Sequence, residues 1–114
     1  MEFQTMDLLV SNLSRLNEAE ESDRQGVYHT LGIFENTIGF NPSLATILTQ
    51  KTTILKWLLE RLQWKKYDEN RGYVAELLPI LLQGSQENRL SFGKAKGIDV
   101  LLQVLSVCVS TIII

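Results

Sequence analysis

The sequence has few of the residues on which disulfides, metal sites and catalysis usually depend. Its 114 residues include one cysteine, Cys108, and one histidine, His29. A single cysteine excludes an intrachain disulfide, and a structural zinc site would lack nitrogen and sulfur ligands. No serine or cysteine nucleophile stands at a recognisable elbow or beside a second acid-base group. The sequence therefore predicts no enzyme activity, no cofactor and no metal site, and a reducing, intracellular compartment fits best.

A basic excess is also missing, which argues against a domain dedicated to nucleic acid. The formal net charge is −2, whereas domains that bind phosphate backbones are usually strongly basic. Residues 18–23 form an acidic turn that contains Glu18, Glu20, Glu21 and Asp23. This turn lacks the alternating pattern and the glycine of a calcium loop. A solvated acidic turn is the favoured interpretation, and such a patch could attract a basic peptide.

Long hydrophobic runs are absent except near the C-terminal end. Residues 100–114, VLLQVLSVCVSTIII, are almost free of charge, but this run is shorter than the roughly 20 residues that a membrane-spanning helix needs. Residues 1–7 show neither the basic nor the apolar region of a signal peptide. We therefore expect no membrane association, with attachment through residues 100–114 as an alternative.

The sequence does contain an apolar pattern that repeats. In residues 54–62, leucines fall at i, i+3, i+4 and i+7, which places them on one buried face of a helix. The same spacing occurs 49 residues upstream and 43 residues downstream. The three sets are Met6, Leu9, Val10 and Leu13; Leu55, Leu58, Leu59 and Leu62; and Ile98, Leu101, Leu102 and Leu105.

A second set of matches supports the same period. Val27, Leu31 and Phe34 match Val74, Leu78 and Leu81 at an offset of 47, and Leu44 matches Leu90 at an offset of 46. A long helix, a short helix and another long helix thus recur in order, with a period typical of HEAT and armadillo repeats. A coiled coil is not favoured, because no heptad pattern continues past about two turns. The predicted fold is an all-α, armadillo/HEAT-like right-handed α-solenoid of about two and a half units, with repeats in residues 1–107 and an atypical apolar tail in residues 108–114.

Caps and breakers predict where the helices begin and end. Ser22 with Gln25 resembles a capping box that opens the second helix, and Gly39 ends that helix. Asn41 and Pro42 open a short helix, Pro79 bends a later helix, and Gly84 closes that later helix. The expected helices are 5–17, 23–37, one from residue 54 that ends around residues 63–67, 73–83 and one from residue 98, with short segments after Pro42 and at 85–92. The expected breaks are 49–53, 67–72 and 93–97.

Several short sequence segments, which occur in order over residues 6–107, resemble the beta-catenin-like family of armadillo-type nuclear proteins. They are Gly26-Val27, His29-Thr30-Leu31, Glu35-Asn36, Trp57-Leu58-Leu59 with Arg61-Leu62, Ile80-Leu81-Leu82-Gln83, Glu87-Asn88-Arg89 and residues 97–103. Members of that family are several times longer than this chain, and residues 108–114 depart from the family pattern. A truncated isoform, a gene-model error or a fragment would each explain both differences.

The resemblance implies a nuclear, non-enzymatic protein-binding scaffold in pre-mRNA splicing, within a Prp19-type complex that also holds a Myb-related splicing factor. It further implies binding of basic, nuclear-localisation-like segments and of an antibody-diversifying cytidine deaminase, without direct nucleic-acid binding. The alternatives are a helical-repeat adaptor with cytosolic partners and a fragment with no independent function. Because the chain ends in apolar residues, self-association through the C-terminal face is also expected.

The candidate partner-binding residues are Trp57, Arg61 and Asn12. In peptide-binding armadillo proteins, a tryptophan followed four residues later by asparagine on the third helix holds an extended peptide. Here Arg61 replaces that asparagine and would repel a basic peptide, so core packing is favoured for Trp57 over partner contact. The run from Trp57 to Tyr67 combines aromatic and basic residues that could stack on bases or on a guanidinium group. The concave face is expected on residues 6–16, 55–63 and 98–105.

Overall fold

The computed structural model describes the backbone of residues 3–113 and the side chains of residues 4–106. Its regular structure is α-helical. The helices are α1 (Phe3–Arg15), α2 (Glu21–Phe40), α3 (Leu44–Lys51), α4 (Ile54–Leu62), α5 (Glu69–Leu82), α6 (Gln86–Lys94) and α7 (Gly97–Ile113). The prediction of an all-α fold is confirmed.

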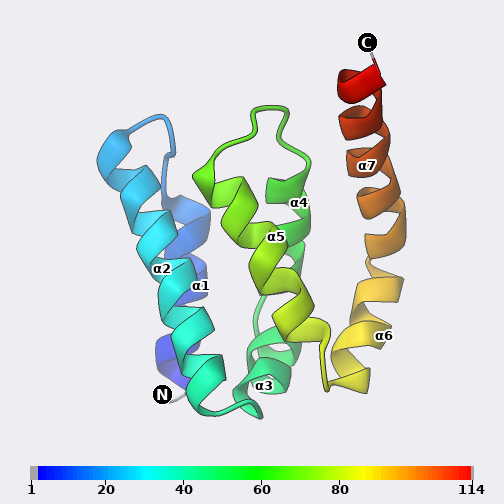
Figure 1. The fold of residues 1–114 in the computed structure, drawn as a ribbon. Helices are drawn as coiled ribbons and strands as arrows, with labels where there is room; N and C mark the ends of the chain where they lie inside the picture. The colour runs from blue at the N-terminus through cyan, green and yellow to red at the C-terminus, as the bar shows by residue number, and fades with distance from the viewer. Residues whose placement is uncertain (1–2, 114) are drawn as a thin grey trace.

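The helices form two three-helix units, α2–α4 and α5–α7, which follow the single helix α1. Equivalent helices of the two units pack on each other: α2 on α5, α3 on α6 and α4 on α7. Figure 1 shows the result as a row of helices from α1 and α2 to α7, with extents of 47 × 35 × 21 Å. Repeats that contact only their neighbours define a solenoid, so the armadillo-like arrangement predicted from the repeats is confirmed.

The buried core follows the first two predicted stripes. Leu55, Leu58, Leu59 and Leu62 of α4 are all buried, as are Met6, Val10 and Leu13 of α1. The offset of 47 also holds, because Val27, Leu31 and Phe34 are buried together with Val74, Leu78 and Leu81. These matched positions place α2 and α5 on a shared apolar contact.

The third stripe does not lie in the core, and that prediction is wrong. Ile98, Leu102 and Leu105 are 58%, 60% and 58% exposed. Helix α7 instead packs through the half-buried Leu101 and Val104. The physical reason is position in the row: α4 is covered by α5 and α7, which follow it, whereas α7 contacts α4 and α6.

The match of Leu44 with Leu90 is also wrong. Leu44 is buried whereas Leu90 is 58% exposed, and Phe92 is the buried apolar residue of α6. The cause is a difference in helix length, since α2 has 20 residues and α5 has 14. Gly39 therefore lies inside α2 rather than ending it. The offset between the units consequently falls from 48 where α2 and α5 begin to 42 where they end.

Several predicted helix ends are displaced. Among the described residues, the N-cap position of α2 is Glu20, without a side-chain cap, so the capping box at Ser22 is wrong. Asp23 accepts a hydrogen bond from the Asn17 amide at 2.9 Å and closes the acidic turn instead. The breaks are shorter than expected, because residues 49–51, 69–72 and 93–94 belong to α3, α5 and α6.

Other local predictions are confirmed. Gly84 ends α5 with a φ of 76°, a left-handed conformation that suits glycine. Ser85 caps α6, because its hydroxyl accepts a hydrogen bond from the Asn88 amide at 3.2 Å. Pro79 lies inside α5, and the bend expected there stays a prediction.

The predicted boundary between residues 107 and 108 falls inside α7, whose backbone is helical to Ile113. The side chains of the predicted apolar tail, residues 108–114, lie outside the described ones. Within the part of the chain that the structure describes, no helix is both long and apolar enough to cross a membrane.

Candidate partner-binding site

Arg61 of α4 carries its charge inside the molecule. Its side chain is 2% exposed. Its guanidinium donates to both oxygens of Glu18 at 2.9 and 3.0 Å, and to both oxygens of Asp68 at 2.9 Å. Glu18 lies in the loop before α2, and Asp68 lies directly before α5. The buried guanidinium of Arg61 therefore connects the loop between α1 and α2 with the loop between α4 and α5.

The protonation of this cluster follows from its contacts. Burial alone would raise the pKa of Asp68, but the hydrogen bond from the Arg71 amide and the ion pair with Arg61 lower that pKa below its ordinary value. Burial alone would lower the pKa of Arg61, and its bonds to Glu18 and Asp68 outweigh this effect and raise the pKa. Arg61 and Asp68 are therefore both ionised at neutral pH.

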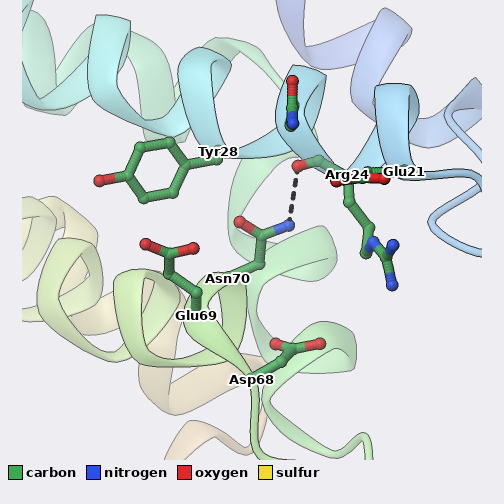
Figure 2. A pocket seen from close by; sticks show the side chains of 7 residues that line it. Glu21, Arg24, Tyr28, Asp68, Glu69 and Asn70 are labelled. Atoms are coloured by element: carbon green, nitrogen blue, oxygen red, sulfur yellow. Dashed lines mark hydrogen bonds between the residues drawn. The ribbon is translucent and has the colours of Figure 1, made fainter.

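Asn70 extends the same cluster towards α2. Its amide nitrogen donates to Glu18 Oε1 at 2.9 Å and to the carbonyl oxygen of Arg24 at 3.0 Å. The second of these bonds is the dashed line in Figure 2. Because Asn70 is buried, these bonds fix the first turn of α5 against the first turns of α2.

An open pocket of about 320 Å³ lies where these first turns meet, and we call it the acidic pocket (Figure 2). Its lining residues come from α2 and from the beginning of α5: Glu21, Arg24, Gln25, Tyr28, Asp68, Glu69 and Asn70. The lining thus holds three carboxylates and the guanidinium of Arg24, and Asp68 is already paired with Arg61. In Figure 2 the carboxylate of Glu69 points across the pocket towards α2, on the side of Tyr28. The pocket is suited to a cationic group next to an aromatic ring.

Tyr73 holds α2 and α5 together beyond the pocket. Its hydroxyl donates to Glu35 Oε1 at 2.8 Å, and its ring meets Tyr28 edge to face at 5.2 Å between centroids. Burial, followed by the bond to Glu35, raises the pKa of Tyr73 to about 12. A Cβ on Gly32 would come within 3.3 Å of the Tyr73 hydroxyl, so the small residue permits this close approach. Tyr28 is therefore held in place at the edge of the pocket.

The three residues predicted to contact a partner lie outside the acidic pocket. Trp57 is half-buried and packs against the core, which confirms the favoured interpretation. Asn12 is half-buried on α1 and accepts a hydrogen bond from Arg15 at 3.5 Å. Arg61 is buried, and its two carboxylate partners offset the repulsion of a basic peptide that its sequence position suggests. Whether these residues contact a partner stays a prediction.

Two aromatic rings in residues 57–67, those of Trp64 and Tyr67, contact guanidinium groups of the same chain. The Arg61 guanidinium lies 3.8 Å from the centre of the Trp64 ring, and that of Arg71 lies 5.5 Å from the centre of the Tyr67 ring. The sequence predicted contact between an aromatic ring and a guanidinium group, but it did not show that the guanidinium groups belong to the same chain. It also missed Asp68, Glu69 and Asn70, which were assigned to a turn; the first two do carry a readable signal, since an acidic cap and first turn favour a helix start.

Comparison with known proteins identifies the family. A profile described as "Catenin-beta-like, Arm-motif containing nuclear" matches residues 1–110. The chain belongs to this family. Beta-catenin-like protein 1 from Homo sapiens and from Rattus norvegicus are each 48% identical to it over 105 residues, or 91% of this chain. The Beta-catenin-like protein 1 homolog from Schizosaccharomyces pombe is 35% identical over 103 residues, or 89% of this chain.

This catenin-beta-like chain spans only part of those relatives. In each, the matched stretch is 18% of the relative's length. The Arm motif named in the family description agrees with the stacked three-helix units. The resemblance drawn from the sequence is therefore confirmed for the family and for the fold.

Proposed function

We propose that this chain is a non-enzymatic, protein-binding scaffold of the nucleus, and that its acidic pocket holds basic, nuclear-localisation-like segments of partner proteins. The observation that carries the proposal is the placement of two exposed carboxylates, Glu21 and Glu69, around an open pocket beside Tyr28. The description of the family as nuclear supports the location. The place of the scaffold in a pre-mRNA splicing complex rests on the family resemblance.

The chemistry of the pocket suits a lysine or arginine side chain. Glu21 and Glu69 are exposed carboxylates, and the lowered pKa of Asp68 keeps it ionised. Tyr28 is 37% exposed and offers a ring face to a cation, a contact worth roughly 0.5–1 kcal/mol at an exposed site. A volume of about 320 Å³ admits the end of a long side chain but not a folded element. An extended basic segment would therefore lie across the beginnings of α2 and α5.

Fluorescence anisotropy with a labelled ten-residue peptide that contains five consecutive lysines and arginines tests this proposal. We expect a dissociation constant of about 10 μM or tighter at about 50 mM salt, and loss of binding at about 500 mM salt, because exposed charges are screened. The double substitution Glu21→Lys with Glu69→Lys should weaken binding at least about ten-fold, or roughly 1.4 kcal/mol.

The double substitution Glu60→Lys with Glu87→Lys is the matched control, because it changes the net charge by the same amount. Glu60 of α4 and Glu87 of α6 are exposed carboxylates, and neither lines the acidic pocket. This variant should bind the peptide nearly as the natural chain does. Failure of the peptide to bind at low salt, or an equal loss in both variants, would show that the acidic pocket is not the site.

A further inference from the structure

A second surface, of opposite character, lies between α5 and α7. We call it the α5/α7 groove. Its volume is about 520 Å³, and its apolar walls include Leu78, Pro79 and Leu82 of α5 and Leu101, Val104 and Leu105 of α7. Arg89 is the charged residue in its lining. Figure 1 shows α7 as the last helix of the row, on the side of the second unit away from α1.

The internal repeat shows what kind of element fits such a groove. Helix α5, the first helix of the second unit, packs on α2 and α4 of the first unit. The residues of α2 that meet Tyr73 of α5 are Tyr28, Gly32 and Glu35. The positions 47 residues later are Ala75, Pro79 and Leu82, and all three line the α5/α7 groove. The surface formed by α5 and α7 is therefore equivalent to the surface formed by α2 and α4. In the first unit α5 covers that surface, and in the second unit it is the open α5/α7 groove.

The third helix of each unit agrees at the position that lines the groove, Leu105. Leu55 and Leu59 of α4 lie beside Val100 of α7. The pair Leu62 and Leu105 is therefore the one that bears on a helix equivalent to α5. Leu62 is 3% exposed, whereas Leu105, its counterpart 43 residues later, is 58% exposed. An apolar position that is covered in one unit is thus open in the next. The helices of residues 3–113 all lie elsewhere, so the covering element comes from outside these residues.

From these equivalences we infer that the α5/α7 groove binds an amphipathic α-helix that lies parallel to α5 and is acidic in its first turn. An adjoining pocket shares Leu62 and Val104 with the groove, and Lys65 and Arg71 line it. No carboxylate lines either pocket among the described residues. Because Lys65 lies in the loop directly before α5, which begins at Glu69, a helix parallel to α5 presents its first turn to these two cations.

The groove also specifies one position of the bound helix. Tyr73 of α5 donates its hydroxyl proton to Glu35 in the first unit. Leu82 stands at the position equivalent to Glu35, so it cannot accept a hydrogen bond. The bound helix therefore carries an apolar side chain where α5 carries Tyr73.

The test uses a labelled peptide that meets these requirements. It has the sequence of residues 68–83, with Tyr73→Leu to match Leu82 and Pro79→Ala to favour the helix, and it keeps the acidic start at Asp68 and Glu69. Anisotropy should give a dissociation constant of about 50 μM or tighter with the natural chain. Leu105→Asp should weaken binding at least ten-fold. The matched control is Leu8→Asp, since Leu8 is 71% exposed on α1, and it should bind the peptide as the natural chain does.

A charge exchange tests the orientation. Lys65→Glu should weaken binding of this peptide several-fold, and a peptide with lysine at positions 68 and 69 should regain that loss. Equal binding by the natural chain and by Leu105→Asp would overturn the proposal. So would a chain that sediments as a dimer, becomes monomeric with Leu105→Asp and is not dissociated by excess peptide, because a second copy would then be the occupant.

Discussion

Arg61 is buried because of its place on α4. It follows Leu58 by three residues, so it shares the inward-facing side of Leu58. The sequence identified this residue through the tryptophan four positions earlier, but it could not show where the guanidinium points. Its partners, Glu18 and Asp68, lie 43 and 7 residues away. Contacts over such separations depend on how the units stack.

Replacing Arg61 tests the buried ion pairs. Arg61→Met keeps a long side chain but leaves Glu18 without its bidentate partner, and we expect the free energy of unfolding to fall by about 3–5 kcal/mol. Urea denaturation measures the change. Arg15→Met, at an exposed residue of α1, serves as the control and should cost less than about 0.5 kcal/mol. A similarly small cost for Arg61→Met would mean that the ion pairs do not hold the two loops.

Because of Tyr73, the free energy of unfolding should decrease at alkaline pH. The pKa of Tyr73 in the folded chain is about 12, above the ordinary value of about 10. A raised pKa contributes stability that is fully present below pH of about 10 and is lost as the pH rises towards 12. The advantage of the natural chain over Tyr73→Phe should therefore shrink between those pH values, as measured by denaturation at several pH values. An advantage that stays constant over this range would contradict the assigned bond to Glu35.

Helix positions could be predicted from the sequence more fully than helix ends. The stripe in residues 54–62 predicted the start of α4 and its buried face, because its pattern depends on neighbours three and four residues apart. The observed end at Leu62 comes before the predicted end around residues 63–67. The start of α5 was placed too late, since residues 69–72 contain polar residues and a glycine. There Asn70 and Arg71 are buried through bonds to Glu18 and to the carbonyl oxygen of Leu62. Such tertiary bonds leave no local signal in the sequence.

Gly97 fixes the junction between α6 and α7. A Cβ at this position would overlap the ring of Phe92, which is buried. Gly97→Ala should therefore lower the free energy of unfolding by about 1–3 kcal/mol through overpacking. Gly93→Ala is the matched control, because it lies in α6 with open space around its Cβ position. That variant should be neutral or up to about 1 kcal/mol more stable, and thermal melts that rank the two variants in the opposite order would disprove this packing.

At the scale of the whole molecule, the stacked units form two surfaces of different character. One carries carboxylates, and the other is apolar with basic residues. The acidic pocket lies between α2 and α5, whereas Arg89 lines the α5/α7 groove and Lys65 lines the pocket that adjoins it. The repeat pattern predicted the stacking of units but neither surface. The pocket needs the first turns of α2 to meet the beginning of α5, and the groove is exposed because Leu105 of α7 is uncovered. Both depend on the order of the helices in the row.

Leu58 tests the stacking itself. It is fully buried at the centre of the row, so Leu58→Ala should cost about 2–5 kcal/mol. Leu8→Ala removes the same atoms from a side chain that is 71% exposed, and it should cost far less. Denaturation that shows a cost below about 0.5 kcal/mol for Leu58→Ala would contradict the observed packing of α4.

The binding of a basic segment by the acidic pocket is tested most directly by following the backbone amides of the chain during titration with the lysine- and arginine-rich peptide. A ¹⁵N-resolved NMR titration at low salt reports each residue separately. The amides of Glu21, Arg24, Tyr28, Glu69 and Asn70 should shift together with one dissociation constant, while those of Leu8 and Leu102 should not move. Shifts centred on α7, or no shifts at peptide concentrations well above 10 μM, would contradict the assignment of this pocket as the protein-binding site.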